Sequence, residues 1–122
     1  LTPGINGPGM MHTNSLLLSS GNTVEIDLQG TNPATGYDQI VVCTSGNVNL
    51  ASATLNLSST FTGNQGTVFT ILDNQGSGTI SGTFTGLAEG AAVTVNGRAY
   101  QISYVGGTGN DVTLTVYDPA TV

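Results

Sequence analysis

Val24–Leu28 reads VEIDL, in which apolar and acidic residues alternate. Successive side chains of a β-strand point to opposite faces, so this spacing predicts a strand with its three apolar residues buried and Glu25 and Asp27 facing water. Val112–Val116, VTLTV, shows the same alternation. Short runs of this kind occur along the whole chain, and no stretch has the composition of an ordinary helix. The sequence therefore predicts an all-β protein.

The size and composition of the chain predict one folded domain. It has 122 residues, enough for a single modest core. Only 7% of the residues are charged, against about 25% in an average soluble domain. Such a composition can indicate disorder, but the regular apolar runs argue against it. Residues 1–14, rich in proline and glycine turns, are expected to form an extended N-terminal segment. Because the chain begins with Leu1, we expect either a processed mature chain or a piece of a longer one.

The charge balance excludes several classes of partner and chemistry. The chain has a net charge of -6 and a single basic residue, Arg98. One cation cannot neutralise a run of phosphates, so nucleic acid and anionic membrane surfaces are unfavourable partners. Without lysine there is no Schiff-base chemistry. No apolar run approaches the roughly 20 residues of a membrane-spanning helix. The single cysteine, Cys43, cannot form an internal disulfide, and its apolar neighbours predict a small buried side chain.

Two features predict how the strands are connected. Asn96-Gly97 stands between the strand candidates Ala92–Val95 and Ala99–Tyr104, and this dipeptide favours a tight turn between antiparallel strands. In addition, glycine-led strand starts recur at intervals of 25, 20, 24 and 19 residues. A β-solenoid uses about 20–25 residues for each coil, so the recurrence favours that architecture. A β-sandwich or jelly roll, with strands every 8–12 residues, is the alternative. The starts are Gly21, Gly46, Gly66, Gly90 and Gly109.

Several sequence motifs of the chain resemble those of a known class of proteins. The most specific pieces are GYDQIVV (36–42), FTILDNQG (69–76), GTFTGLAEGAAVTV (82–95) and SYVGGTGNDVTLTV (103–116). Together they resemble the C-terminal segment of bacterial autotransporter-type passenger regions and related large exported surface proteins. The resemblance covers nearly the whole chain. It implies a right-handed parallel β-helix, located outside the cell or at its surface, with this stretch closing the C-terminal end. It implies no catalytic residues.

Gly106–Asp111 reads GGTGND, which fits the opening of the calcium-binding β-roll repeat. In that repeat, glycines let backbone carbonyls and a carboxylate converge on the ion. However, the repeat shares its ions between successive copies, and this chain has one copy, with its apolar residues at Val112 and Leu114 rather than at Thr113. Asp111 is therefore a weak calcium candidate. In the alternative interpretation the glycines make a tight turn and Asp111 binds turn amides.

Other polar residues offer little chemistry. Tyr37-Asp38 follows the loop GTNPATG and could line a sugar-binding surface, or the tyrosine could pack over a strand end while the aspartate caps the turn. His12 is the only histidine, and no nucleophile motif accompanies it. Glu25 and Asp27 have the spacing of a glycosidase pair but lie in a plain alternating strand. We expect no enzymatic activity, no cofactor and no metal.

The sequence therefore predicts a structural module of a secreted or cell-surface bacterial protein, which closes or stabilises a β-solenoid. One alternative is a self-assembling subunit of an extracellular fibre or sheath, adhesin-like in character. Another is a carbohydrate- or calcium-binding module, with at most weak glycan contact. Low charge leaves the sheet edges poorly protected against joining another chain. We expect contacts with a second copy or with other parts of a larger surface protein, near Met10, Met11 and the strand from Asp111 to Val116.

Overall fold

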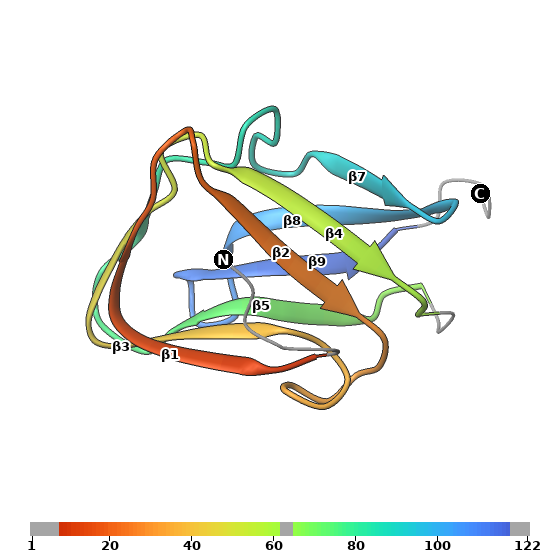
Figure 1. Cartoon of the computed structure of the whole chain (residues 1–122), viewed down its shortest axis with the longest axis horizontal. Coiled ribbons are helices and arrows are strands. Elements are labelled where there is room, and N and C mark those ends of the chain that lie inside the picture. The colour runs from red at the N-terminus through yellow and green to blue at the C-terminus, as the bar shows by residue number, and fades with distance from the viewer. Residues whose placement is uncertain (1–7, 62–64, 118–122) are drawn as a thin grey trace.

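Figure 1 shows the computed structural model of the chain, in which residues 8–61 and 65–117 are described. These residues form nine β-strands and no helix, so the prediction of an all-β protein is confirmed. The strands are β1 (Met10–Leu17), β2 (Thr23–Leu28), β3 (Gln39–Asn49), β4 (Thr54–Ser59), β5 (Val68–Asn74), β6 (Ile80–Ser81), β7 (Ala92–Val95), β8 (Arg98–Gly106) and β9 (Asp111–Val116).

The strands form two sheets. The larger sheet is mixed and has the order β1-β3-β5-β9-β8-β7, with β6 paired to the C-terminal end of β3. The smaller sheet consists of β2 and β4, and β4 lies against β7. The strands therefore follow one another in a curled, half-barrel arrangement that begins with β1 and ends with β2 (Figure 1).

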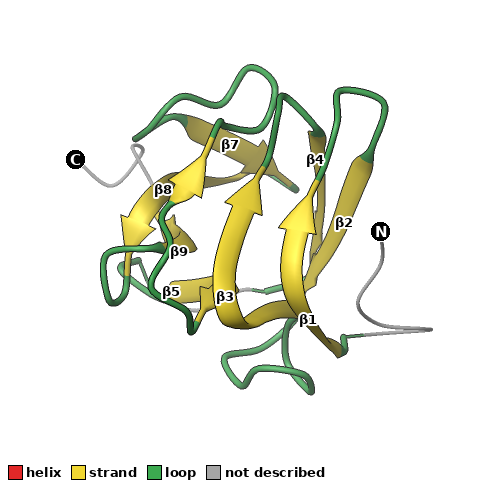
Figure 2. Cartoon of the chain, turned by 90° about the vertical axis from the view of Figure 1, so that its left-hand side faces the viewer, coloured by secondary structure: helices red, strands yellow, loops and turns green. Residues whose placement is uncertain are grey.

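The first part of the chain makes parallel pairs. Met10 lies beside Gln39 in β1 and β3, Ile40 lies beside Leu72 in β3 and β5, and β2 pairs with β4 in the same sense. Figure 2 shows β1 and β3 side by side and running in one direction. Parallel neighbours need a long connection, because the chain must return to its starting end before the next strand begins. Here each return passes through a strand of the small sheet.

The length of that return corrects the predicted repeat. Asp27 and Ser58, which lie opposite each other in β2 and β4, are 31 residues apart in the sequence. The predicted interval of 19 to 25 residues is wrong, because Gly46 lies inside β3 and does not start a strand. A complete β-solenoid is not confirmed, since the large sheet is mixed. The alternative of a β-sandwich or jelly roll, folds built from antiparallel sheets, is not confirmed either, because β1-β3-β5 and β2-β4 are parallel.

The last three strands are antiparallel, and the predicted turn between two of them is confirmed. Asn96 and Gly97 have φ angles of 52° and 75°, and Val95 pairs with Arg98 across the turn. Positive φ at both central positions matches the twist of the flanking strands, which is why Asn-Gly is favoured there. On its other side β8 pairs with β9, and β9 pairs with β5. The antiparallel strands are thereby joined to the parallel ladder.

The core lies between the two sheets and draws on both parts of the chain. Val24, Ile26 and Leu28 of β2 are 1%, 1% and 0% exposed, as the alternation predicts. At the centre the ring of Phe69 is fully buried. It meets Tyr37 and Phe61 edge to face, with ring centroids 5.2 and 5.0 Å apart, and Tyr100 at 6.1 Å. Aromatic pairs of this geometry add about 0.5–1.5 kcal/mol each beyond their buried area.

Part of the predicted extended N-terminal segment lies in a strand. Its residues 10–14 belong to β1, where they pair with β3 over Met10 to Thr13. The segment joins the sheet because its backbone N–H and C=O groups complete the parallel ladder. Residues 1–7 of that prediction lie outside the described residues.

Candidate functional site

Asp111, the calcium candidate, is a structural acceptor at the start of β9. Its Oδ1 accepts a hydrogen bond from the backbone N–H of Asn74 at 2.8 Å, and its Oδ2 accepts one from that of Thr108 at 3.4 Å. Gly107 has a φ of +57°, and a Cβ there would stand 2.1 Å from Oδ2, so the turn requires glycine. The bond from Thr108 is the one expected of an aspartate that binds turn amides. Across residues 8–61 and 65–117, no three His, Cys, Asp or Glu side chains gather as metal ligands.

The four predicted contact residues divide into two groups. Asp111 and Val116 are 4% and 1% exposed and lie in β9, between β5 and β8. A strand with a neighbour on each side is not an edge, so their placement does not fit a contact with another chain. Met10 and Met11 lie in β1, the terminal strand of the large sheet. Met10 is 36% exposed, whereas Met11 packs against the core.

Tyr37 and Asp38 do not form a sugar-binding surface, because both are buried. Asp38 accepts hydrogen bonds from the backbone N–H groups of Gly9 at 2.6 Å and Asp27 at 2.9 Å. It thus ties the chain before β1 to β2. Burial raises the pKa of the Asp38 carboxyl above its usual value, and these two hydrogen bonds oppose the shift. Burial likewise raises the pKa of the Tyr37 hydroxyl.

The remaining candidates are dispersed. His12 is exposed on β1, and Cys43 is half-buried rather than buried as predicted. Glu25 is exposed on β2, whereas Asp27 is half-buried and accepts hydrogen bonds from the side chains of Gln29 and Ser58. No helix within the described ranges is long and apolar enough to cross a membrane.

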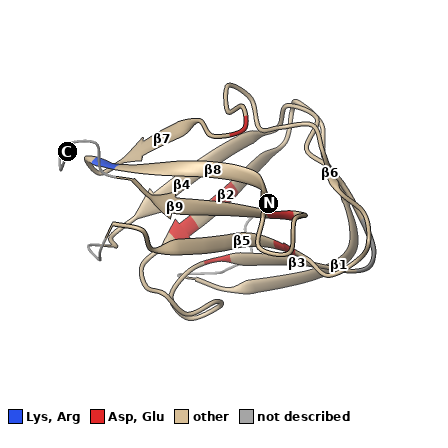
Figure 3. Ribbon diagram, turned by 180° about the vertical axis from the view of Figure 1, so that it is seen from behind, with Lys and Arg blue, Asp and Glu red and all other residues tan. Residues whose placement is uncertain are grey.

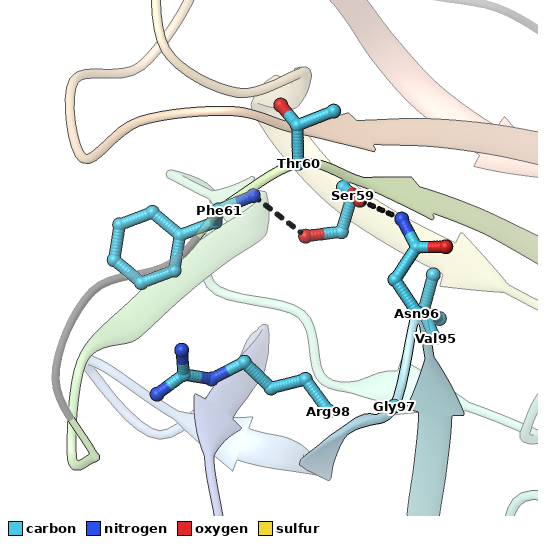
Figure 4. Close-up of a pocket in the computed structure, with 7 residues that line it drawn as sticks. All are labelled: Ser59, Thr60, Phe61, Val95, Asn96, Gly97 and Arg98. Atoms are coloured by element: carbon cyan, nitrogen blue, oxygen red, sulfur yellow. Dashed lines mark hydrogen bonds between the residues drawn. The ribbon is translucent and has the colours of Figure 1, made fainter.

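The structure instead shows a pocket at the turn between β7 and β8, of about 340 Å³. Its walls come from two places: the end of β4 with the residues after it, and the turn itself (Figure 4). A hydrogen bond links these two walls: the side-chain amide of Asn96, in the tight Asn-Gly turn, donates to the backbone carbonyl of Ser59. The lining residues are Ser59, Thr60, Phe61, Val95, Asn96, Gly97 and Arg98.

The hydroxyl of Ser59 fixes the β4 side of this pocket. It lies 2.7 Å from the hydroxyl of Tyr100 and accepts a hydrogen bond from the backbone N–H of Phe61 at 3.2 Å. Tyr100 is fully buried in the core. The wall of the pocket is therefore anchored to the interior, and its geometry is set by packing rather than by an independent loop.

Arg98 gives the pocket its charge. It is the only Lys or Arg in the chain, and Figure 3 shows it apart from the acidic residues of the described ranges. The guanidinium carbon lies 6.0 Å from the centre of the Phe61 ring, which is the range of a cation–π contact. The Nε atom is buried and has no hydrogen-bond partner among residues 8–61 and 65–117. An unpaired buried donor is costly, because it loses its hydrogen bond to water without gaining one from the protein.

The sequence contains one indication of this pocket. Arg98 is the sole cation of a chain with a net charge of -6, and it directly follows the Asn-Gly turn. The contribution of Ser59 and Phe61 was not accessible from sequence, because they lie far from the turn along the chain. Comparison with protein-family models, curated proteins and solved structures finds no significant match to this chain.

Proposed function

We propose that this chain is a non-enzymatic structural module of a secreted or cell-surface bacterial protein, in which it closes one end of a right-handed parallel β-helix. The observation that carries the proposal is the change of strand direction within one sheet. Parallel neighbours β1, β3 and β5 are followed by antiparallel β9, β8 and β7. The resemblance of its motifs to exported β-helix proteins points the same way.

The parallel part has the geometry of stacked coils. β3 lies on β1 and β4 lies on β2, so the same two faces are repeated at each return of the chain. In solenoids every repeat buries its inward residues against its neighbours, and the terminal repeats need a cap. The antiparallel strands supply that cap here. They continue the sheet beyond β5, and β7 reaches β4 of the small sheet.

The opposite end of the arrangement is different. β1 and β2 are the terminal strands of the two sheets among the described residues, and they occupy the same end of the stack. β1, MMHTNSLL, contains no Asp, Glu, Lys or Arg, the charged residues that commonly protect an edge. Its Leu17 is 70% exposed. These features favour a partner that adds parallel strands at β1 and β2, as a preceding coil would.

A second candidate is a self-assembling subunit of an extracellular fibre, favoured by the same uncharged edge. The two candidates differ in how a free chain would associate. If β1 is the only adhesive edge, two copies join through it and the association stops at a closed dimer. If β1 of one copy joins β7 of the next, the contact is head to tail and generates an open series.

Sedimentation velocity over a range from micromolar to millimolar protein tests this proposal. The module hypothesis predicts a monomer–dimer equilibrium, and the fibre hypothesis predicts a distribution that lengthens with concentration. Leu17→Lys places a charge on the edge and is expected to weaken association at least tenfold. Val105→Lys is the matched control, because Val105 is 65% exposed but lies in β8, which is not a terminal strand of the sheet. A wild-type chain that stays monomeric at millimolar concentration would contradict the open edge.

A further inference from the structure

The pocket between the end of β4 and the β7–β8 turn has features of a ligand site that the structural role does not require. We propose that it binds a uronic acid residue, that is, a sugar ring carrying one carboxylate. The inference is independent of the proposed structural function. It rests on the charge of Arg98, on the shape of the pocket and on the overall charge of the protein.

Among the described residues, the cation of the pocket has no anionic partner. The guanidinium of Arg98 lies over the ring of Phe61, and in the described part of the chain no carboxylate pairs with it. Its Nε atom likewise has no hydrogen-bond partner in that part of the chain. A guanidinium presents parallel N–H groups that match the two oxygens of a carboxylate. A small rotation of the side chain toward a bound carboxylate would therefore satisfy the unpaired Nε–H as well as the outer nitrogens.

The walls of the pocket fit a sugar ring beside that carboxylate. Figure 4 shows the Phe61 ring and the guanidinium on one side of the pocket, and Ser59 and Asn96 on the other. The part of the aromatic ring beside the guanidinium offers apolar contact to the C–H groups of a pyranose. Across from it, Asn96 retains a carbonyl oxygen and a second amide hydrogen, which can bind sugar hydroxyls. The volume, about 340 Å³, falls at the lower end of the range of about 300–1,000 Å³ found for small-molecule sites.

The charge of the whole protein selects a ligand with a single negative charge. The chain carries a net charge of -6, so its field repels polyanions such as nucleic acids, and one arginine cannot offset a run of phosphates. A single carboxylate on an otherwise neutral, hydroxyl-rich ring meets both conditions. Its charge pairs with Arg98, and its hydroxyls meet the polar wall.

The test is a titration of the isotope-labelled whole chain followed by amide NMR, with glucuronate as the probe. Glucose, which lacks the carboxylate, and acetate, which lacks the ring, are the two controls. Glucuronate is expected to shift the amide signals of Phe61, Asn96, Gly97 and Arg98 and to bind at least tenfold more tightly than either control. Arg98→Gln should weaken binding at least tenfold, and Arg98→Lys, which keeps the charge but loses the planar fork, at least threefold. The unchanged spectrum of the rest of each variant shows that it is folded.

Three outcomes would overturn the inference. The first is the absence of shifts at the pocket at saturating glucuronate. The second is equal binding of glucose or acetate, which would mean that no uronate is specifically recognised. The third is tighter binding of a short acidic peptide than of glucuronate, which would assign the pocket to a protein carboxylate instead. None of these outcomes depends on whether β1 is an open edge.

Discussion

The parallel strands β1, β3 and β5 and the antiparallel strands β7, β8 and β9 share one sheet, but different connections hold them together. β7 and β8 are joined by two residues, Asn96 and Gly97, and β8 and β9 by a short turn that Asp111 ties down. By contrast, the parallel strands β3 and β5 join distant parts of the sequence. The side chain of Gln39 donates a hydrogen bond to the backbone carbonyl of Thr70, 31 residues away. Short connections cost little entropy to close, whereas distant pairings must be stabilised by packing.

The antiparallel and parallel strands therefore differ in what determines their structure. The antiparallel part determines its own structure locally and leaves β9 enclosed between two neighbours. The parallel part depends on stacking, and its outermost strands, β1 and β2, each pair on one side only within the described ranges. The two parts are nevertheless one core, because Phe69 of β5 contacts rings from both.

The largest expected effect comes from breaking that shared core. Phe69→Ala should lower the free energy of unfolding by about 3–5 kcal/mol, the usual cost of removing a buried phenylalanine side chain. Urea unfolding followed by tyrosine fluorescence and by far-ultraviolet circular dichroism measures it. Val68→Ala, at an adjacent position that is 51% exposed, is the control and should change the free energy of unfolding by less than about 0.5 kcal/mol. Two separate transitions in the wild type would show that the parallel and antiparallel parts do not share a core.

A smaller effect is expected from the turn that defines the antiparallel part. Gly97 has a φ of +75° with nothing near its Cβ position, so Gly97→Ala isolates the backbone cost of a left-handed conformation. We expect a loss of about 1–2 kcal/mol in the free energy of unfolding. Gly21→Ala is the matched control, since Gly21 also has open space but no positive φ. Equal effects of the two substitutions on the urea midpoint would argue against the tight turn.

The strands that could be predicted from the sequence are those with local indications, and the parallel pairings could not be predicted. The bounds of β2, β7 and β9 agree with the alternation of Val24–Leu28, the Asn-Gly turn and the run Val112–Val116, because these indications are local. The pairing of β1 with β3 and the length of each return could not be predicted. They depend on which distant strands bury each other, and glycine spacing carries no information about that.

The candidate site was less predictable than the fold. Asp111 and Tyr37-Asp38 stood out because polar residues near turns suggest ligands, yet the structure uses them as internal acceptors and packing groups. The pocket at Arg98 is not encoded in any one stretch of the sequence, since it exists only where the end of β4 meets the β7–β8 turn. Residues that are distant in the sequence create it.

The smallest expected effect is a pH dependence of the free energy of unfolding, caused by Asp38 in the parallel part of the fold. Burial raises the pKa of Asp38 above 3.8, so the folded state binds this proton more tightly than the unfolded state. Its contribution to the free energy of unfolding is therefore fully present below the unfolded pKa and is lost as pH rises through the folded pKa. Relative to Asp38→Asn, the wild type should lose stability as the pH rises from about 4 toward neutrality. A difference between their urea midpoints that does not change with pH would contradict the shift.

Amide hydrogen exchange at two protein concentrations tests the central claim, that β1 is an open edge and β9 a closed interior strand. In dilute solution the amides of Val112 and Leu114 should be among the slowest to exchange, and those along Met10–Leu17 should exchange much faster. At high concentration, protection should rise along Met10–Leu17 and remain unchanged in β9. Protection of β1 equal to that of β9 in dilute solution, or a rise confined to other strands, would contradict the account.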